Sequence, residues 1–143
     1  MAESDRTAAR RAGALSAATD SLTLDCVETD LTVEGGKRAI AKALARDAGM
    51  TAVLCMSDVL ALGVYFGLSE AGLCVPDDVL VIGFDNLDRA KDVVPPLTTN
   101  DLPAGLMGRE VAAQFVDHLE DGAVLMPQLL PSRIVERASV RTL

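Results

Sequence analysis

Runs of apolar residues in the middle of the chain predict a strand, a helix and a second strand in direct succession. Residues 52–56 are apolar without interruption and end at Ser57, and residues 79–84 form a second such run that ends at Asp85. Runs of this kind are typical of strands that are covered on both faces. Between them, residues 59–68 carry no charge. This indicates a helix that is buried on more than one side, either within the domain or under a partner subunit.

Amphipathic and alternating patterns extend this order on both sides of the central segment. Residues 32–47 and 106–119 repeat apolar side chains at helical spacing, with charged side chains opposite. Residues 22–28 alternate in the manner of a half-buried strand. Strands that alternate with helices pair in parallel through right-handed crossovers, so the chain is predicted to be a three-layer α/β protein with a mostly parallel sheet. A helix is also predicted at 4–18, and short strands at 97–100 and 129–135.

The carboxyl ends of the two apolar strands are the predicted ligand-binding edge, because ligands bind at this edge of open parallel sheets. Asp58 follows the first strand and is best explained as the N-cap of the next helix. Asp85 follows the second strand, and it can either accept hydroxyl hydrogen bonds from a ligand or cap the turn there. Arg10 can donate two hydrogen bonds in a fork, or it is a solvated helix charge.

The composition and charge of the chain limit the classes of protein to which it can belong. The chain has 143 residues and half of them are apolar, which is enough for one domain with a core. Its formal net charge is −8 and its 13 basic residues are scattered, so the chain is not expected to bind DNA by itself, since a phosphate-binding surface needs clustered Lys and Arg. The sequence shows no leader and no apolar run near the roughly 18 residues of a membrane span. A cytoplasmic protein that does not bind membranes is therefore expected.

Residues with catalytic or metal-binding chemistry are few. Cys26, Cys55 and Cys74 lie in apolar contexts without a CxxC spacing, and we interpret them as reduced, buried side chains. His118 has no second histidine or cysteine in a matching motif. Because no nucleophile–base pair and no metal-ligand set is apparent, the sequence predicts neither an enzyme nor a metal or cofactor site.

Several short motifs, in order and at matching spacing, resemble the LacI/GalR family of transcription regulators and the sugar-binding proteins that share their core. The resemblance implies a periplasmic-binding-protein-like type I lobe that is incomplete, because the helix-turn-helix, hinge helix and N-terminal lobe of such a regulator have no counterpart. Residues 1–143 would form a single C-terminal lobe, and 102–122 a helix that would pack on a missing N-terminal lobe. The motifs are Arg10-Arg11-Ala12-Gly13 and the segments 51–58, 61–63, 72–85, 96–99 and 130–139.

The resemblance also implies site residues. In the family the effector lies between the lobes, and the matching positions are Arg10, Ser57 and Asp85. Ser57 stands where Asn is usual. Other departures, at positions where the family tends to have an aromatic residue or Gln, are Leu31, Leu102 and Ala104.

A homodimer is expected through the uncharged helix at 59–68. Its large apolar side chains are too many to bury on one face, and the resemblance places two residues at the subunit contact. The predicted interface residues are Leu62, Tyr65, Phe66 and Val93.

Two functions follow from these observations. The first is the effector-sensing and dimerising portion of a LacI/GalR-type regulator without its DNA-binding domain, for which a sugar or a nucleoside-like molecule is the expected effector. The alternative is a structural or interaction remnant that binds no small molecule, or a fragment of a sugar-binding protein. The apolar stripe of the helix at 106–119 must be covered, so we expect this helix to fold back on its own domain or to exchange with a second copy.

Overall fold

A four-stranded sheet forms the centre of the fold in the computed structural model, which describes residues 5–19 and 22–141. The strands are β1 (Ala52–Leu54), β2 (Leu80–Phe84), β3 (Thr98–Asp101) and β4 (Arg133–Val135), and they lie in this order in the sheet. The first three are parallel, and β4 is antiparallel to β3. The predicted class, α/β with a mostly parallel sheet and an incomplete lobe, is confirmed.

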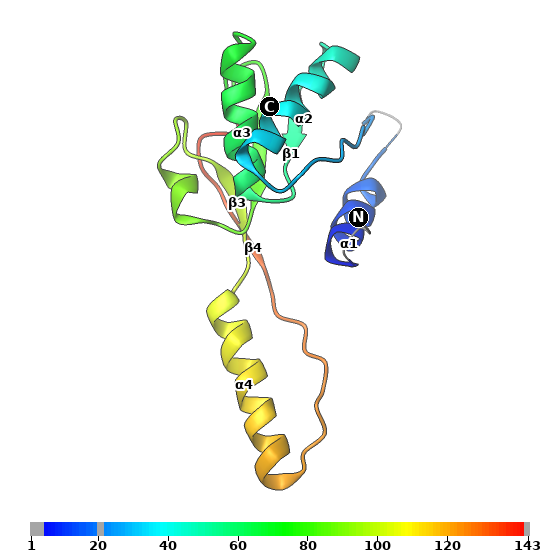
Figure 1. Ribbon diagram of the computed structural model, residues 1–143, viewed down its shortest axis with the longest axis vertical. Helices are drawn as coiled ribbons and strands as arrows, with labels where there is room; N and C mark the ends of the chain where they lie inside the picture. The colour runs from blue at the N-terminus through cyan, green and yellow to red at the C-terminus, as the bar shows by residue number, and fades with distance from the viewer. Residues whose placement is uncertain (1–4, 20–21, 142–143) are drawn as a thin grey trace.

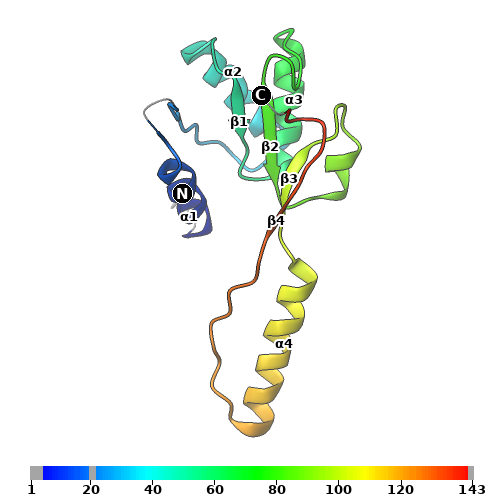
Figure 2. The ribbon, with the colours of Figure 1, turned by 180° about the vertical axis from the view of Figure 1, so that it is seen from behind.

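Two helices, α2 (Val33–Arg46) and α3 (Asp58–Glu70), pack together beside β1 and β2 (Figures 1 and 2). Their contact is close because small residues face it. A Cβ atom added at Gly63 would overlap the carbonyl oxygen of Val33. The core lies between these helices and the sheet. Its fully buried large side chains are Ile40, Leu68, Val79, Val81 and Leu97.

The predicted strand at 22–28 is wrong, because this segment is irregular in the structure. A strand needs a hydrogen-bonded neighbour, and β1, at the edge of the sheet, pairs only with β2 among the described residues. Side chains hold the segment to α2 instead, as Arg46 donates to Asp25 over 2.9 Å and the Thr29 hydroxyl donates to the Gly35 carbonyl over 2.9 Å. The segment therefore keeps its alternating pattern without joining the sheet.

The predicted burial of the three cysteines is only partly right. Cys55, which directly follows β1, is buried, whereas Cys26 and Cys74 are exposed. Cys26 lies in the irregular segment, where no sheet covers it. Cys74 lies in the turn after α3, where its backbone N–H donates to Asp78 over 2.7 Å.

The last helix, α4 (Ala104–Asp121), extends away from the rest of the domain (Figure 1). It ends at Gly122, whose φ of 68° suits glycine, and the chain then returns to β4 without regular structure. We call α4 together with the return segment 122–132 the arm. No residue of α4 is buried, so the expected folding of this helix back onto its own sheet does not occur. Exchange with a second copy stays a prediction.

Candidate functional site

The carboxyl ends of β1 and β2 meet the first helix, α1 (Asp5–Ser16), through one side chain, Arg10. Its Nη1 donates to the carbonyl oxygen of Met56 over 2.8 Å. Its guanidinium carbon lies 3.8 Å from the centre of the Phe84 ring, and its Nη2 lies 3.7 Å from Oδ1 of Asp85. Arg10 and Asp85, far apart in sequence, are thus brought together.

This cluster is open enough to meet a ligand. The side chains of Arg10 and Asp85 are 16% and 32% exposed. At 3.7 Å their contact is an ion pair and not a hydrogen bond, and such a partly exposed pair contributes at most about 1 kcal/mol. Among the described residues, no donor lies within hydrogen-bonding distance of the Asp85 carboxylate. Its oxygens are therefore available to accept hydroxyl hydrogen bonds.

The backbone at Asp85 is strained. Asp85 has a φ of 104° and Asn86 a φ of 51°, and each such non-glycine residue costs roughly 1–3 kcal/mol. Four hydrogen bonds hold this turn. The N–H of Asn86 donates to the Thr99 hydroxyl oxygen over 3.3 Å. The N–H of Asp85 donates to the carbonyl oxygen of Asn100 over 2.9 Å, Nη2 of Arg137 donates to Oδ1 of Asn86 over 2.7 Å, and the N–H of Leu87 donates to a carboxylate described below. The Asp85 side chain itself caps nothing in the turn.

Ser57, not Asp58, caps α3, so the predicted N-cap role of Asp58 is wrong. The Ser57 side chain accepts from the N–H of Val59 over 3.3 Å, and the residue is buried. Only one residue can occupy an N-cap. Asp58 is the first residue of the helix, and its side chain turns inward. Two capping residue types in succession are the sequence signal that could have indicated this.

Asp58 is a buried carboxylate that links α3 to two other segments, a role that the sequence analysis did not predict. Only 1% of the residue is exposed. Its Oδ1 accepts from the Thr99 hydroxyl over 2.6 Å, and its Oδ2 accepts from the N–H of Leu87 over 2.7 Å. Burial raises the pKa of Asp58, and the hydrogen bonds from Thr99 and Leu87 oppose that rise. A Cβ atom at Gly83 would overlap this carboxylate, so glycine is required beside it. The carboxylate ties α3 and β3 to the turn that carries Asp85.

The residues predicted for the dimer interface lie on and beside α3. Phe66 is 58% exposed, while Leu62, Tyr65 and Val93 are half-buried. The Tyr65 hydroxyl donates to the Pro95 carbonyl over 2.9 Å, and burial raises the pKa of Tyr65 to about 12. Tyr65 therefore supports its own domain, and Phe66 is the side chain most open to a partner.

Within residues 5–19 and 22–141, no three His, Cys, Asp or Glu side chains are grouped so that they could hold a metal ion. Nδ1 of His118 lies 2.8 Å from the carbonyl oxygen of Ala123, just after the end of α4. None of the described helices has both the length and the apolar character that crossing a membrane requires.

Comparisons with known proteins agree with this fold. Residues 2–140 match the family described as periplasmic binding protein-like domain. The chain is 37% identical over 115 residues to the HTH-type transcriptional repressor CytR of Escherichia coli, covering 80% of this chain and 34% of that protein. It thus spans about a third of the length of this curated relative.

Two solved structures show the same architecture. The LacI family transcriptional regulator from Enterococcus faecalis with bound ribose is 35% identical, with a TM-score of 0.73 over 79% of this chain and 42% of that one. The sugar-binding transcriptional regulator of the LacI family from Escherichia coli, complexed with phosphate, is 27% identical, with a TM-score of 0.88 over 98% of this chain and 52% of that one.

Proposed function

This chain belongs to the LacI/GalR family of transcription regulators, and we propose that it is the effector-sensing and dimerising portion of such a regulator. The proposed effector is a small hydroxylated molecule, a sugar or a nucleoside, because relatives of this family have been solved with ribose and with other sugars. Because the relatives are transcriptional repressors, we also propose that the chain acts in the cytoplasm and is not an enzyme.

The observation that carries this proposal is the pairing of Arg10 with Asp85 at the carboxyl edge of the sheet. A carboxylate can accept hydrogen bonds from two neighbouring hydroxyls, and a guanidinium can donate two in a fork. The ion pair between them is weak and partly exposed, so ligand hydroxyls can enter at little cost. The strained turn at Asp85 fits this role, since such strain is concentrated at functional sites.

Ser57 is the third proposed effector contact, and its side chain has less hydrogen-bonding capacity free for a ligand. Its hydroxyl is buried and serves as the cap of α3. A direct contact with the effector would have to use the lone pair or proton that the cap leaves free. Effector affinity is therefore assigned mainly to Arg10 and Asp85.

Binding can be tested by a thermal-shift screen with sugars and nucleosides, followed by calorimetry on any hit. A ligand that binds only the folded chain must raise the melting temperature. We expect Asp85→Asn to weaken binding about 5- to 150-fold, as lost charged hydrogen bonds cost about 1–3 kcal/mol. Asp88→Asn is the matched control, because Asp88 begins the short 3₁₀ helix η1 (Asp88–Lys91) that follows this turn, and its side chain is 97% exposed. If no sugar or nucleoside in the screen binds, the result favours the alternative function, an interaction remnant without a ligand. If Asp85→Asn and Asp88→Asn bind a ligand with equal affinity, the proposed site is refuted.

The dimer is proposed to form through the outer side of α3, with Leu62, Phe66 and the neighbouring Val93 in the contact and Tyr65 beneath it. Support comes from the exposure of Phe66 in the part of α3 between Asp58 and Glu70, which carries no charge. A charge placed in an apolar interface weakens association strongly. Sedimentation equilibrium should show a smaller assembly for Phe66→Glu than for the wild type, and an unchanged mass would refute this interface.

A further inference from the structure

The position of the Asp85 carboxylate is set mainly by the backbone that carries it. Among the described residues, no donor lies within hydrogen-bonding distance of this carboxylate, and its ion-pair partner Arg10 lies 3.7 Å away. The φ of 104° at Asp85 and the φ of 51° at Asn86 are uncommon for residues other than glycine. Such a turn persists only where its surroundings hold it. The contacts of the turn therefore decide where the carboxylate lies.

Arg137 reaches this turn from the segment that follows β4. Its Nη2 donates to Oδ1 of Asn86 over 2.7 Å, and its Nη1 donates to the carbonyl oxygen of Leu97 over 2.6 Å. The other three hydrogen bonds of the turn are made by backbone N–H groups, whereas Arg137 holds the Asn86 side chain. A charged donor forms a stronger hydrogen bond than a neutral one. Arg137 thus links the strained turn firmly to the residue that precedes β3.

The base from which the Arg137 side chain extends is fixed. The Arg137 N–H donates to the Thr98 hydroxyl oxygen over 2.9 Å, and the Thr98 hydroxyl donates to the Arg137 carbonyl oxygen over 3.0 Å. Two residues further on, Ser139 is fully buried, and its hydroxyl donates to the carbonyl oxygen of Val81 over 2.6 Å. These bonds fix the segment to β2 and β3 without the guanidinium. The Nη2 contact therefore serves the turn and not the sheet.

We propose that Arg137 is a positioning residue of the effector edge, which holds the turn after β2 so that the Asp85 carboxylate is presented to a ligand. The proposal rests on the proposed function, in which Asp85 accepts hydrogen bonds from effector hydroxyls. Arg137 acts through Asn86 and not by contact with the effector. A carboxylate that is already in place binds without the cost of ordering the turn, so Arg137 contributes to effector affinity.

Amide hydrogen exchange of the whole chain without ligand, followed by NMR, tests the positioning directly. Arg137→Met keeps a long side chain but removes both of its hydrogen bonds. We expect the N–H groups of Asp85 and Leu87, which the turn protects, to exchange about 10- to 100-fold faster relative to the N–H of Val64. Val64 is buried in α3, so its N–H reports on unfolding of the domain as a whole.

Two further variants separate the link to Asn86 from other effects. Arg141→Met is the matched control, because Arg141 lies in the same segment and its Nη1 is 3.4 Å from Oδ1 of the exposed Asp77; it should leave the exchange ratio unchanged. Asn86→Gly removes the acceptor of Arg137, and glycine suits a φ of 51°. In that background Arg137→Met should add little. A ratio that Arg137→Met leaves unchanged, or raises equally in both backgrounds, would overturn the proposal.

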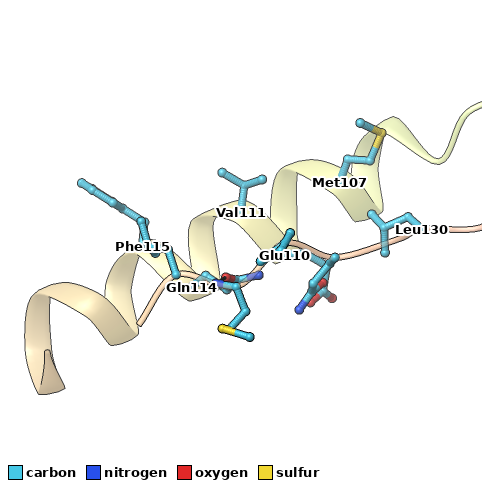
Figure 3. Close-up of a pocket in the computed structure, with 10 residues that line it drawn as sticks. Met107, Glu110, Val111, Gln114, Phe115 and Leu130 are labelled. Atoms are coloured by element: carbon cyan, nitrogen blue, oxygen red, sulfur yellow. Dashed lines mark hydrogen bonds between the residues drawn. The ribbon is translucent and has the colours of Figure 1, made fainter. Parts of the chain in front are cut away.

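Calorimetry with ribose, the sugar bound to the Enterococcus faecalis regulator, measures the consequence for binding. We expect Arg137→Met to weaken ribose binding roughly 10-fold, and Arg137→Lys, which keeps the charge but not the fork, to weaken it less. Glu110→Gln is the control for a sugar that binds in the cleft of the arm, where Glu110 is among the lining residues (Figure 3). This variant should leave the affinity unchanged.

The two measurements distinguish failure of the positioning role from failure of the proposed function. If the wild type does not bind ribose, or if Asp85→Asn binds it as well as the wild type does, the proposed site loses its support. The exchange ratio then still decides whether Arg137 holds the turn. If Asp85→Asn weakens ribose binding and Arg137→Met does not, the positioning role is rejected and the proposed site stands.

Discussion

Replacing the buried carboxylate of Asp58 with a methyl group tests whether this residue holds the effector edge in place. Asp58→Ala removes the acceptor that receives the Thr99 hydroxyl over 2.6 Å and the Leu87 N–H over 2.7 Å. Thr99 is fully buried, so its hydroxyl proton is left without an acceptor, although the hydroxyl oxygen still accepts from the N–H of Asn86 over 3.3 Å. α3 then loses its polar link to β3 and to the turn at Asp85.

The cost follows from these contacts. An orphaned buried donor costs about 1–3 kcal/mol, and a hydrogen bond to a charged group is worth about 1.5–3 kcal/mol. Relief from burying the carboxylate offsets part of this loss. We expect Asp58→Ala to lower the free energy of unfolding by about 2–4 kcal/mol, which corresponds to a melting temperature lower by roughly 10 °C.

Urea unfolding measures the effect. Circular dichroism follows the helices, and fluorescence follows Tyr65, which is the single tyrosine in a chain without tryptophan. Asp88→Ala is the control, and it should change stability by less than about 0.5 kcal/mol. Thr99→Val removes the other partner of the Thr99–Asp58 hydrogen bond, so the double variant should cost less than the sum of the single ones by about 1 kcal/mol or more. Equal stability of Asp58→Ala and Asp88→Ala would refute the reasoning.

The pH dependence provides a second check on Asp58. Burial raises its pKa above the usual 3.8, so the folded chain holds this proton more tightly than the unfolded chain does. The stability that Asp58 contributes is therefore fully present below the unfolded pKa and falls as pH rises through the folded pKa. Asp58→Ala should accordingly cost less at pH 7 than near pH 4.5, and the opposite trend would contradict the raised pKa.

Three further outcomes are expected. Gly63→Ala should destabilise the chain by several kcal/mol, because the added Cβ would overlap the Val33 carbonyl. Gly13→Ala should stabilise α1 by up to about 1 kcal/mol, because the space around Gly13 is open. Thermal unfolding of the two variants measures both effects. Cys26 and Cys74 should react at once with a thiol reagent near pH 8 and Cys55 only on unfolding, since burial raises its pKa to about 12. A gel shift at moderate salt should show no sequence-dependent retention of duplex DNA, because the net charge is −8.

The apolar pattern of the sequence was sufficient to predict the central elements. The runs that predicted two buried strands became β1 and β2, and the uncharged segment between them became α3. These predictions succeed because a segment that is apolar throughout can be satisfied only by burial. The motifs that resemble the LacI/GalR family were likewise sufficient to predict the family and the fold class.

The tertiary structure decided what depends on neighbours. The segment at 22–28 has the pattern of a strand but remains irregular, because hydrogen-bond partners and not side-chain alternation make a strand. Between Ser57 and Asp58, only the packing of α3 on the sheet shows which one caps the helix and which one turns inward. The approach of Arg10 to Asp85 likewise depends on how α1 lies against the strand ends. The stripe on α4 was visible in the sequence, but its exposure was not, since amphipathicity specifies that a face needs cover and not what supplies it.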